Sequence, residues 1–259
     1  MYKLSILLPT CQRGPLLKAA IESVAAHTKC NYELIVIDGA STDNTAAVLD
    51  GASVRLGNRL KVIRETKRRG FVRALNAGFA AATGEFVCWL NDDARPRHGA
   101  LDKAAALMER APADVGMLAM FHHWNSNKNI AFQCERDGTT YSVCHVRGTL
   151  YANFPIGRRK VFEQLGFLDE QFVFCAADPD LSLKAWNTGL RVEPAWGVCI
   201  DHDEHADDRR AEDSPQMQAD NARLFAKWDL PPRNPLANDF DPSRPCTLRG
   251  SRSAGSLAA

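Results

Sequence analysis

Short apolar runs alternate with helical patterns through the first third of the chain, and this alternation constrains the fold more than any other feature. The apolar runs are KLSILLPT, ELIVID, LKVIRE and EFVCWLND, and helical periodicity covers about residues 15–27, 42–49 and 71–82. Strands that alternate with helices form parallel sheets, and because helices cover both faces of such sheets the strands are almost wholly apolar. The pattern therefore predicts an α/β fold.

The sheet is expected to become mixed beyond this part. A helix is predicted over about 99–109, and NIAFQCE and TTYSVCHV have the pattern of a β-hairpin. A short helix over 159–165, a helix that opens at Asp178-Pro179 and a last strand, RVEPAWGVCIDH, follow. Residues 231–259 are rich in Pro, Arg, Ser, Asn and Gly, which predicts an extended or disordered tail.

Charge and composition exclude several classes of protein. The 259 residues contain 32 Lys and Arg against 31 Asp and Glu, a formal net charge of +1, so no global field attracts nucleic acid. No stretch of about 18 apolar residues could span a bilayer, and the N-terminal apolar run is too short for a signal peptide. The eight cysteines include no C-x-x-C pair, which argues against a zinc ribbon. We expect a cytoplasmic protein, either free or peripheral at the inner membrane face.

Polar residues end each apolar run of the parallel part. They are Thr10, Asp38, Glu65 and the triplet Asn91, Asp92 and Asp93. Because the carboxyl ends of parallel strands share one sheet edge, where ligands bind, these residues should converge. Adjacent carboxylates repel each other unless a cation or a set of donors compensates them, and a divalent metal is the simplest candidate. A turn before Arg95 and Pro96 is the alternative explanation.

The basic segment KRRGFVRALNAG, residues 67–78, stands at the start of the third predicted helix. Basic residues beside a helix N-terminus repel the macrodipole unless an anion, such as a pyrophosphate, lies there. We expect Arg69 and Arg73 to face that anion, whereas Lys67 and Arg68 fit a solvated charge run. Asp38 should point into the crevice, where a carboxylate accepts hydrogen bonds from a base or ribose.

Two later residues are further candidates. Asp178 is either a structural N-cap or a base that takes the proton from an attacking hydroxyl, and the residues alone leave both open. His202 ends the last predicted strand and is either a polar exit residue or a metal ligand.

In this order and spacing, the segments resemble the inverting glycosyltransferases of the GT-A fold. The resemblance is to the large bacterial family 2, which includes rhamnosyl-, galactosyl- and N-acetylglucosaminyltransferases, and it covers about residues 3–205. SILLPTCQR is similar to the family's P-T-Y-N-R turn, VIDGASTDNT to its V-D-D/N-G-S-T-D-x-T, and GFVRALNAGFAAATGEFVCWLNDD to the stretch that runs into the D-x-D motif. ADPDLSLKAWNTG is similar to the E-D-x-D-L segment, and WGVCIDH to the strand that ends in His.

The resemblance implies a role for each matching residue. Asp93 is implied as a ligand of a divalent cation, Mg²⁺ or Mn²⁺, with His202 as a second ligand. Asp178 corresponds to the family's general base. The expected donor contacts are Pro9, Thr10, Asp38, Arg69, Arg73, Asn91 and Asp92.

The implied activity is the metal-dependent transfer of a sugar, with inversion, from a UDP-, GDP- or dTDP-sugar to a hydroxyl acceptor. The acceptor would be a glycan, a lipid-linked sugar or a small molecule. The implied fold is a single GT-A domain over 1–230, with a Rossmann-like nucleotide-sugar-binding half over 1–95, an acceptor-binding half over 96–230 and the tail over 231–259.

Three departures from the family pattern keep a second reading open. Cys11-Gln12 and Gly39-Ala40 replace the usual residues after the first two strands, and Ala177 stands where a Glu is common. These changes are compatible with a non-catalytic nucleotide-sugar-binding or scaffold protein that retains the fold.

Overall fold

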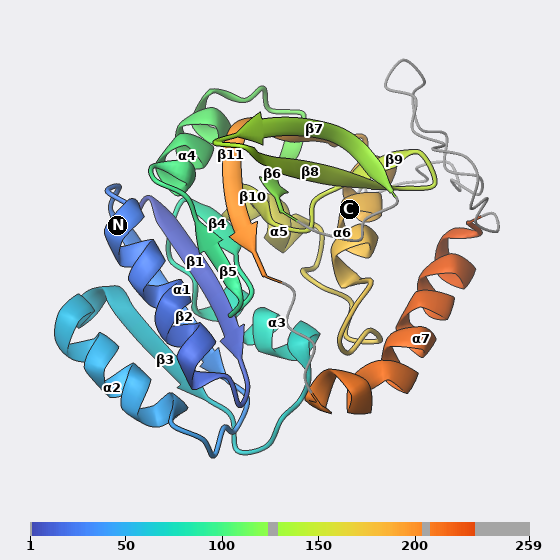
Figure 1. Cartoon of the computed structure of the whole chain (residues 1–259). Coiled ribbons are helices and arrows are strands. Elements are labelled where there is room, and N and C mark those ends of the chain that lie inside the picture. Colours follow the sequence, from blue (N-terminus) through green and yellow to red (C-terminus); the bar gives the residue numbers. More distant parts are fainter. Residues whose placement is uncertain (1, 124–128, 204–207, 231–259) are drawn as a thin grey trace, which may run out of the picture.

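The computed structural model describes residues 2–123, 129–203 and 208–230, so the predicted tail lies outside the described residues (Figure 1). The first part of the sheet consists of β1 (Leu4–Thr10), β2 (Tyr32–Asp38), β3 (Leu60–Arg64) and β4 (Phe86–Trp89). β1 pairs in parallel with both β2 and β4, and β2 pairs in parallel with β3. The predicted parallel arrangement is therefore confirmed.

The remaining strands make the sheet mixed, as predicted. They are β5 (Ala94–Pro96), β6 (Val115–His122), β7 (Ile130–Arg136), β8 (Thr139–Val146), β9 (Thr149–Tyr151), β10 (Pro155–Arg158) and β11 (Arg191–His202). Along the main path the order is β3-β2-β1-β4-β10-β6-β11-β5, and β10 is antiparallel to both β4 and β6. The predicted hairpin is β7 and β8, which Figure 1 shows along one edge of the molecule.

The helices are α1 (Gly14–His27), α2 (Thr45–Leu56), α3 (Phe71–Ala81), α4 (Ala100–Arg110), α5 (Arg159–Gln164), α6 (Ala177–Asn187) and α7 (Asp208–Trp228), with a 3₁₀ turn at Gly57–Arg59. The prediction of α2 was wrong at both ends. Its start shifts because the backbone amides of Thr42 and Asp43 donate to the side chain of Gln12 instead of opening a helix. Its end extends to Leu56, which is buried against the sheet.

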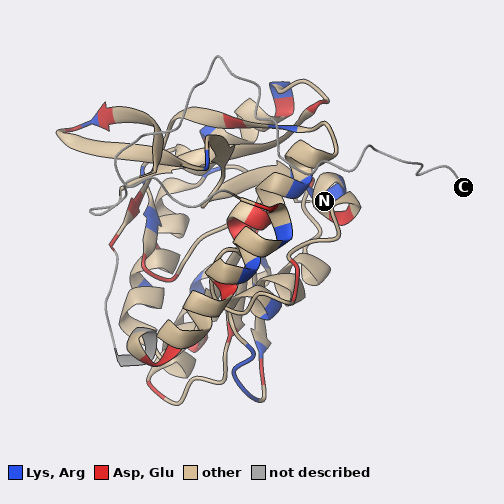
Figure 2. Ribbon diagram, turned by 90° about the vertical axis from the view of Figure 1, so that its right-hand side faces the viewer, with Lys and Arg blue, Asp and Glu red and all other residues tan. Residues whose placement is uncertain are grey.

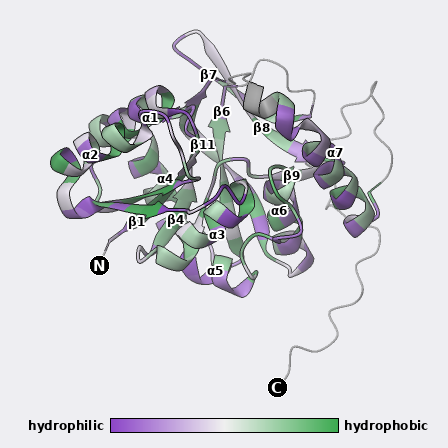
Figure 3. Ribbon diagram, turned by 90° about the horizontal axis from the view of Figure 1, so that it is seen from below, coloured by the Kyte–Doolittle hydropathy of each residue, from purple (hydrophilic) through white to green (hydrophobic). Residues whose placement is uncertain are grey.

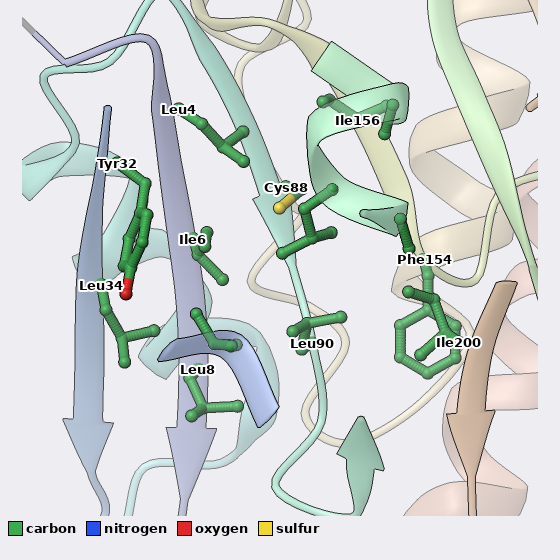
Figure 4. Close-up of a cluster of buried hydrophobic side chains, with 14 of the residues drawn as sticks. Leu4, Ile6, Leu8, Tyr32, Leu34, Cys88, Leu90, Phe154, Ile156 and Ile200 are labelled. Atoms are coloured by element: carbon green, nitrogen blue, oxygen red, sulfur yellow. The ribbon is translucent and has the colours of Figure 1, made fainter. Parts of the chain in front are cut away.

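Side chains of β1 alternate between two core layers. Leu4, Ile6 and Leu8 point to one face of the sheet (Figure 4). On that face they belong to one core cluster with apolar residues of α1, α2 and α4. Leu7 points to the other face, which α3 and α6 cover. Each fully buried leucine contributes about 1.5–3 kcal/mol relative to its exposed state. β1 and β6 are accordingly hydrophobic along their length in Figure 3, and this double-sided core holds the strand ends in place.

Helix α7 was not predicted. Most of the helix is hydrophilic in Figure 3. Among its described side chains, Leu224 is the one apolar side chain that is fully buried. Leu224, Phe225 and Trp228 recur at helical spacing near its C-terminal end, but Pro215 and the charged first half of the segment made this signal easy to overlook. Figure 2 shows basic and acidic segments interspersed over the described chain, in keeping with the near-zero net charge. No helix in the described ranges is both long and apolar enough to cross a membrane, and their cysteines are free thiols.

Candidate active site

A cavity of about 260 Å³ opens where the carboxyl ends of the parallel strands meet. Eight polar or charged side chains form much of its wall: Thr10, Arg13, Arg68, Asn91, Asp92, Asp93, Asp178 and His202. Pro9, Gly39, Glu65, His122, Asn153, Asp213 and Met217 also line it. The predicted convergence of separate segments at one sheet edge is therefore present.

The adjacent carboxyl groups of Asp92 and Asp93 are compensated by a cation of the protein itself. Nη1 of Arg13 lies 3.1 Å from Asp92 Oδ1 and 3.2 Å from Asp93 Oδ2, and the three side chains are less than 10% exposed. Thr10 Oγ1 also donates to Asp92 Oδ2 at 2.9 Å. Charge repulsion alone therefore does not require a metal, because Arg13 and Thr10 already supply a cation and a donor.

Strand pairing brings His202 to Asp93. β5 runs antiparallel to β11, with Ala94 opposite His202, and the amide of Asp203 donates to the carbonyl of Asp93 at 3.2 Å. His202 Nε2 consequently lies 3.2 Å from Asp93 Oδ1. Burial raises the pKa of the Asp93 carboxyl, but the contact with His202 and the charge of Arg13 outweigh it and hold the pKa below its usual value.

These two side chains fit a small divalent cation. Asp93 Oδ1 is buried and accepts no aligned hydrogen bond from the described residues. Two neighbouring ligands of an octahedral ion, each about 2.1 Å from it, lie about 3 Å apart, close to the 3.2 Å between Asp93 Oδ1 and His202 Nε2. No third His, Cys, Asp or Glu of the described part of the chain completes the group. Magnesium sites with one or two protein ligands take the remainder from water and substrate phosphates.

Asp178 lies half-buried on the cavity wall as the second residue of α6. Burial raises the pKa of its carboxyl to about 7, against the opposing effects of a backbone hydrogen bond and of Asn153. Asn153 Nδ2 donates to Asp178 Oδ2 at 2.7 Å. A carboxyl group with a pKa near neutrality, open to a cavity, suits proton transfer at physiological pH.

His122 is a further residue of the cavity wall. It is 1% exposed, and burial lowers its pKa to about 3, so its ring is neutral at physiological pH. The ring packs edge-on against Phe154 and His202, with centroids 5.3 and 6.1 Å away. It therefore helps to fix the orientation of the His202 ring.

The predicted donor contacts divide into two groups. Pro9, Thr10, Asn91 and Asp92 line the cavity. Asp38 is buried at the end of β2, and its Oδ1 accepts the amide of Ser41 at 3.0 Å, while Gly39 takes the place on the cavity wall.

The basic segment is oriented differently from the prediction. Arg69 donates from Nε to Glu65 Oε1 at 2.8 Å, and Arg73 donates to Glu170 at 3.2 Å. Neither lines the cavity, and their assignment to the donor stays a prediction. Arg68, assigned to a solvated run, instead lies on the wall beside Gly70.

Three further residues were missed by the sequence analysis. Arg13 follows the P-T-C-Q stretch directly, and the R of the P-T-Y-N-R turn was a signal for it. Asn153 lies in the loop between β9 and β10, and Asp213 lies in the unpredicted α7, and neither belongs to a motif that the sequence analysis used.

Comparisons with known proteins identify the family of the chain. The family model described as glycosyl transferase family 2 matches residues 5–166. The PGL/p-HBAD biosynthesis glycosyltransferase of Mycobacterium bovis (strain BCG / Pasteur 1173P2) is 32% identical over 148 residues, which are 54% of this chain and 56% of the relative. The chain thus spans little more than half the length of this curated relative.

Solved structures share the fold. The mannosyltransferase PcManGT from Pyrobaculum calidifontis, in complex with GDP-Man and Mn²⁺, has a TM-score of 0.65 at 19% identity, covering 87% of this chain and 64% of that one. S. aureus TarS 1-349 with UDP-GlcNAc has a TM-score of 0.61 at 17% identity, covering 86% and 66%. The predicted GT-A fold is confirmed, and with the family model matching more than half of its length, the chain belongs to glycosyl transferase family 2.

Proposed function

We propose that the protein transfers a sugar, with inversion, from a nucleoside diphosphate sugar to an acceptor hydroxyl. The observation that carries this proposal is the Asp178 carboxyl, whose pKa burial raises to about 7 on the wall of the cavity that also holds Asp92 and Asp93. Family membership supports sugar transfer, and the mannosyltransferase and TarS structures contain GDP-Man and UDP-GlcNAc respectively.

Asp178 is the general base in this proposal. The acceptor O–H gives its proton to the ionised carboxyl as the oxygen bonds to the anomeric carbon, and the bond from that carbon to the diphosphate oxygen breaks at the same time. Attack from the face opposite the leaving group inverts the anomeric configuration. Asn153 holds one oxygen of Asp178 by a 2.7 Å hydrogen bond, which orients the other toward an acceptor.

The opposite part of the site would hold the donor. Arg68 and the first turn of α3 line the cavity, and a guanidinium beside a helix N-terminus attracts a diphosphate. Thr10 and Arg13 keep Asp92 and Asp93 in fixed positions before any ligand binds. A divalent cation, held by Asp93 and His202, would offset the charge that develops on the departing nucleoside diphosphate.

The two parts of the chain have different roles in this proposal. We propose that residues 1–95 bind the nucleotide sugar and that residues 96–230 bind the acceptor, because Asp92 and Asp93 end the first part while Asn153 and Asp178 belong to the second.

A ligand screen followed by one substitution tests the proposal. UDP-, GDP- and dTDP-sugars are compared by thermal shift with and without Mn²⁺, since a ligand selective for the folded state raises its apparent stability. Asp178→Asn should abolish transfer from the selected donor and leave nucleotide binding unchanged. Asp50→Asn serves as the control, because Asp50 is an exposed carboxylate that does not line the cavity. The N-cap of α6 is Ala176, so loss of binding in Asp178→Asn would show that Asp178 has a structural role within the first turn and that the base lies elsewhere.

The same assay separates the second reading, a non-catalytic nucleotide-sugar-binding or scaffold protein. Such a protein would bind a donor without transferring its sugar or slowly hydrolysing it. The raised pKa of Asp178 favours turnover, since a carboxyl that only stabilised the first turn of α6 would gain from being charged and not from being neutral.

A further inference from the structure

A buried carboxyl group of α7 holds the segment that leads to Asp178. Asp220 is 0% exposed, and its Oδ2 accepts three consecutive backbone amides, those of Val173, Phe174 and Cys175, at 3.0, 2.8 and 3.1 Å. Its Oδ1 accepts Gln216 Nε2 at 3.0 Å. Nothing in the proposed chemistry uses Asp220.

The held segment links the donor side of the cavity to the proposed base. Val173 also accepts, through its carbonyl, the amide of Val72 in the first turn of α3, at 3.1 Å. A Cβ at Gly70 would lie 2.8 Å from that carbonyl oxygen, so the two backbones approach as closely as glycine allows. The segment then passes through Ala176, with φ +63°, and α6 begins at the next residue.

Helix α7 is attached at two other places around the same cavity. Asp213 accepts the guanidinium of Arg68 through both oxygens, with Nη1–Oδ1 at 3.0 Å, and Cys175 Sγ donates to the carbonyl of Met217 at 3.3 Å. Asp213 and Met217 themselves line the cavity. Farther along, Trp228 Nε1 donates to the buried Asp180, two residues after Asp178, at 2.8 Å.

We propose that Asp220 is a positioning residue for Asp178, so that α7 is a working part of the active site. The proposal rests on the proposed function of Asp178. The side chain of Asp178 is held by the Asn153 hydrogen bond, and the rest of its placement comes from the backbone at the start of α6. Asp220 fixes that backbone, because its three hydrogen bonds set the path of the residues directly before it.

Asp220→Leu tests this role, since the variant keeps about the size of the side chain but removes both acceptor oxygens, which leaves the amides of Val173, Phe174 and Cys175 without that partner. We expect kcat to fall by about a hundredfold, the loss that a displacement of about 1 Å causes in a catalytic group, while the Kd for the nucleoside diphosphate stays unchanged. Glu212→Gln is the matched control, because it removes an exposed carboxyl from the same helix and should leave kcat unchanged. A folded Asp220→Leu variant with the wild-type kcat overturns the proposal.

Two further measurements keep the result decisive. Gln216→Leu removes only the hydrogen bond to Oδ1 and should lower kcat by about fivefold, which covers the case in which Asp220→Leu does not fold. Hydrogen exchange of the amides of Val173–Cys175 needs no turnover and should become at least about tenfold faster in either variant.

The transfer assay and the hydrogen-exchange measurement test the proposed function and the role of Asp220 separately. Absence of transfer by the wild type with every donor overturns the proposed function and leaves the exchange measurement to decide on Asp220. Wild-type exchange rates in both variants overturn the anchoring by Asp220, even if kcat falls.

Discussion

Removing Arg13 should expose the electrostatic cost of the two neighbouring carboxylates. Arg13 is 8% exposed and contacts Asp92 and Asp93 within 3.2 Å. Removing one partner of a buried ion pair costs about 3–5 kcal/mol, because the remaining charge is left uncompensated. Against a total stability of about 5–15 kcal/mol, this is a large fraction. Arg13→Met should therefore lower the free energy of unfolding by about 3–5 kcal/mol at pH 7.5 in EDTA.

Urea unfolding followed by circular dichroism measures this loss. The control is Arg55→Met, because Arg55 is 48% exposed and lies 3.8 Å from Glu22, a surface pair expected to contribute less than about 1 kcal/mol. Adding Asp92→Asn to Arg13→Met should recover part of the loss, since one of the uncompensated charges is then gone. Equal losses in Arg13→Met and Arg55→Met would refute the reasoning.

Three other predictions follow from the site. The kcat/KM for transfer should rise about tenfold per pH unit below pH 7 and level above it, because Asp178 of the free enzyme must lose its proton, and its pKa is about 7. A flat profile of kcat/KM between pH 5 and 8 would exclude Asp178 as the base. The raised pKa also means that Asp178 stabilises the fold below its unfolded pKa of about 3.9 and that this contribution is lost as the pH rises through 7. Asp178→Asn should accordingly have a higher Tm than the wild type at pH 8 and a similar one at pH 4, in scanning calorimetry. In isothermal titrations, Arg68→Ala should weaken nucleoside diphosphate binding by about tenfold or more, whereas Arg69→Ala should leave it unchanged. Weaker binding in Arg69→Ala but not in Arg68→Ala would instead support the prediction made from the sequence, in which Arg69 faces the anion.

The convergence of the site was predictable because it is a consequence of topology. Once the apolar runs are parallel strands, their polar ends share one edge, and Thr10 and Asn91–Asp93 meet there. The family pattern added Asp178 and His202, which lie on elements that return from much later in the chain.

The orientation of single side chains was less predictable. Arg68 and Arg69 are neighbours in sequence, but Glu65 binds Arg69, and this leaves Arg68 on the cavity wall. Which arginine faces the ligand depends on the local turn before Gly70, whose φ is +95°, and residue type does not determine that turn.

The contribution of α7 to the site could not be predicted from the hydrophobic pattern of the sequence. The helix is attached by Asp213 and Asp220 through hydrogen bonds to Arg68 and to backbone amides, and single polar residues leave no periodic signal. Arg13 was overlooked for a related reason, because its partners lie 79 and 80 positions later in the chain.

The central claim is a single displacement with Asp178 as the base, and the anomeric configuration of the product tests it most directly. Proton NMR of the reaction with the donor selected by thermal shift gives the configuration before mutarotation, for transfer or for slow donor hydrolysis. The account predicts that an α-linked donor yields a β product at the first detectable turnover and that Asp178→Asn yields none. Retention of the α configuration, or full turnover by Asp178→Asn, would contradict it.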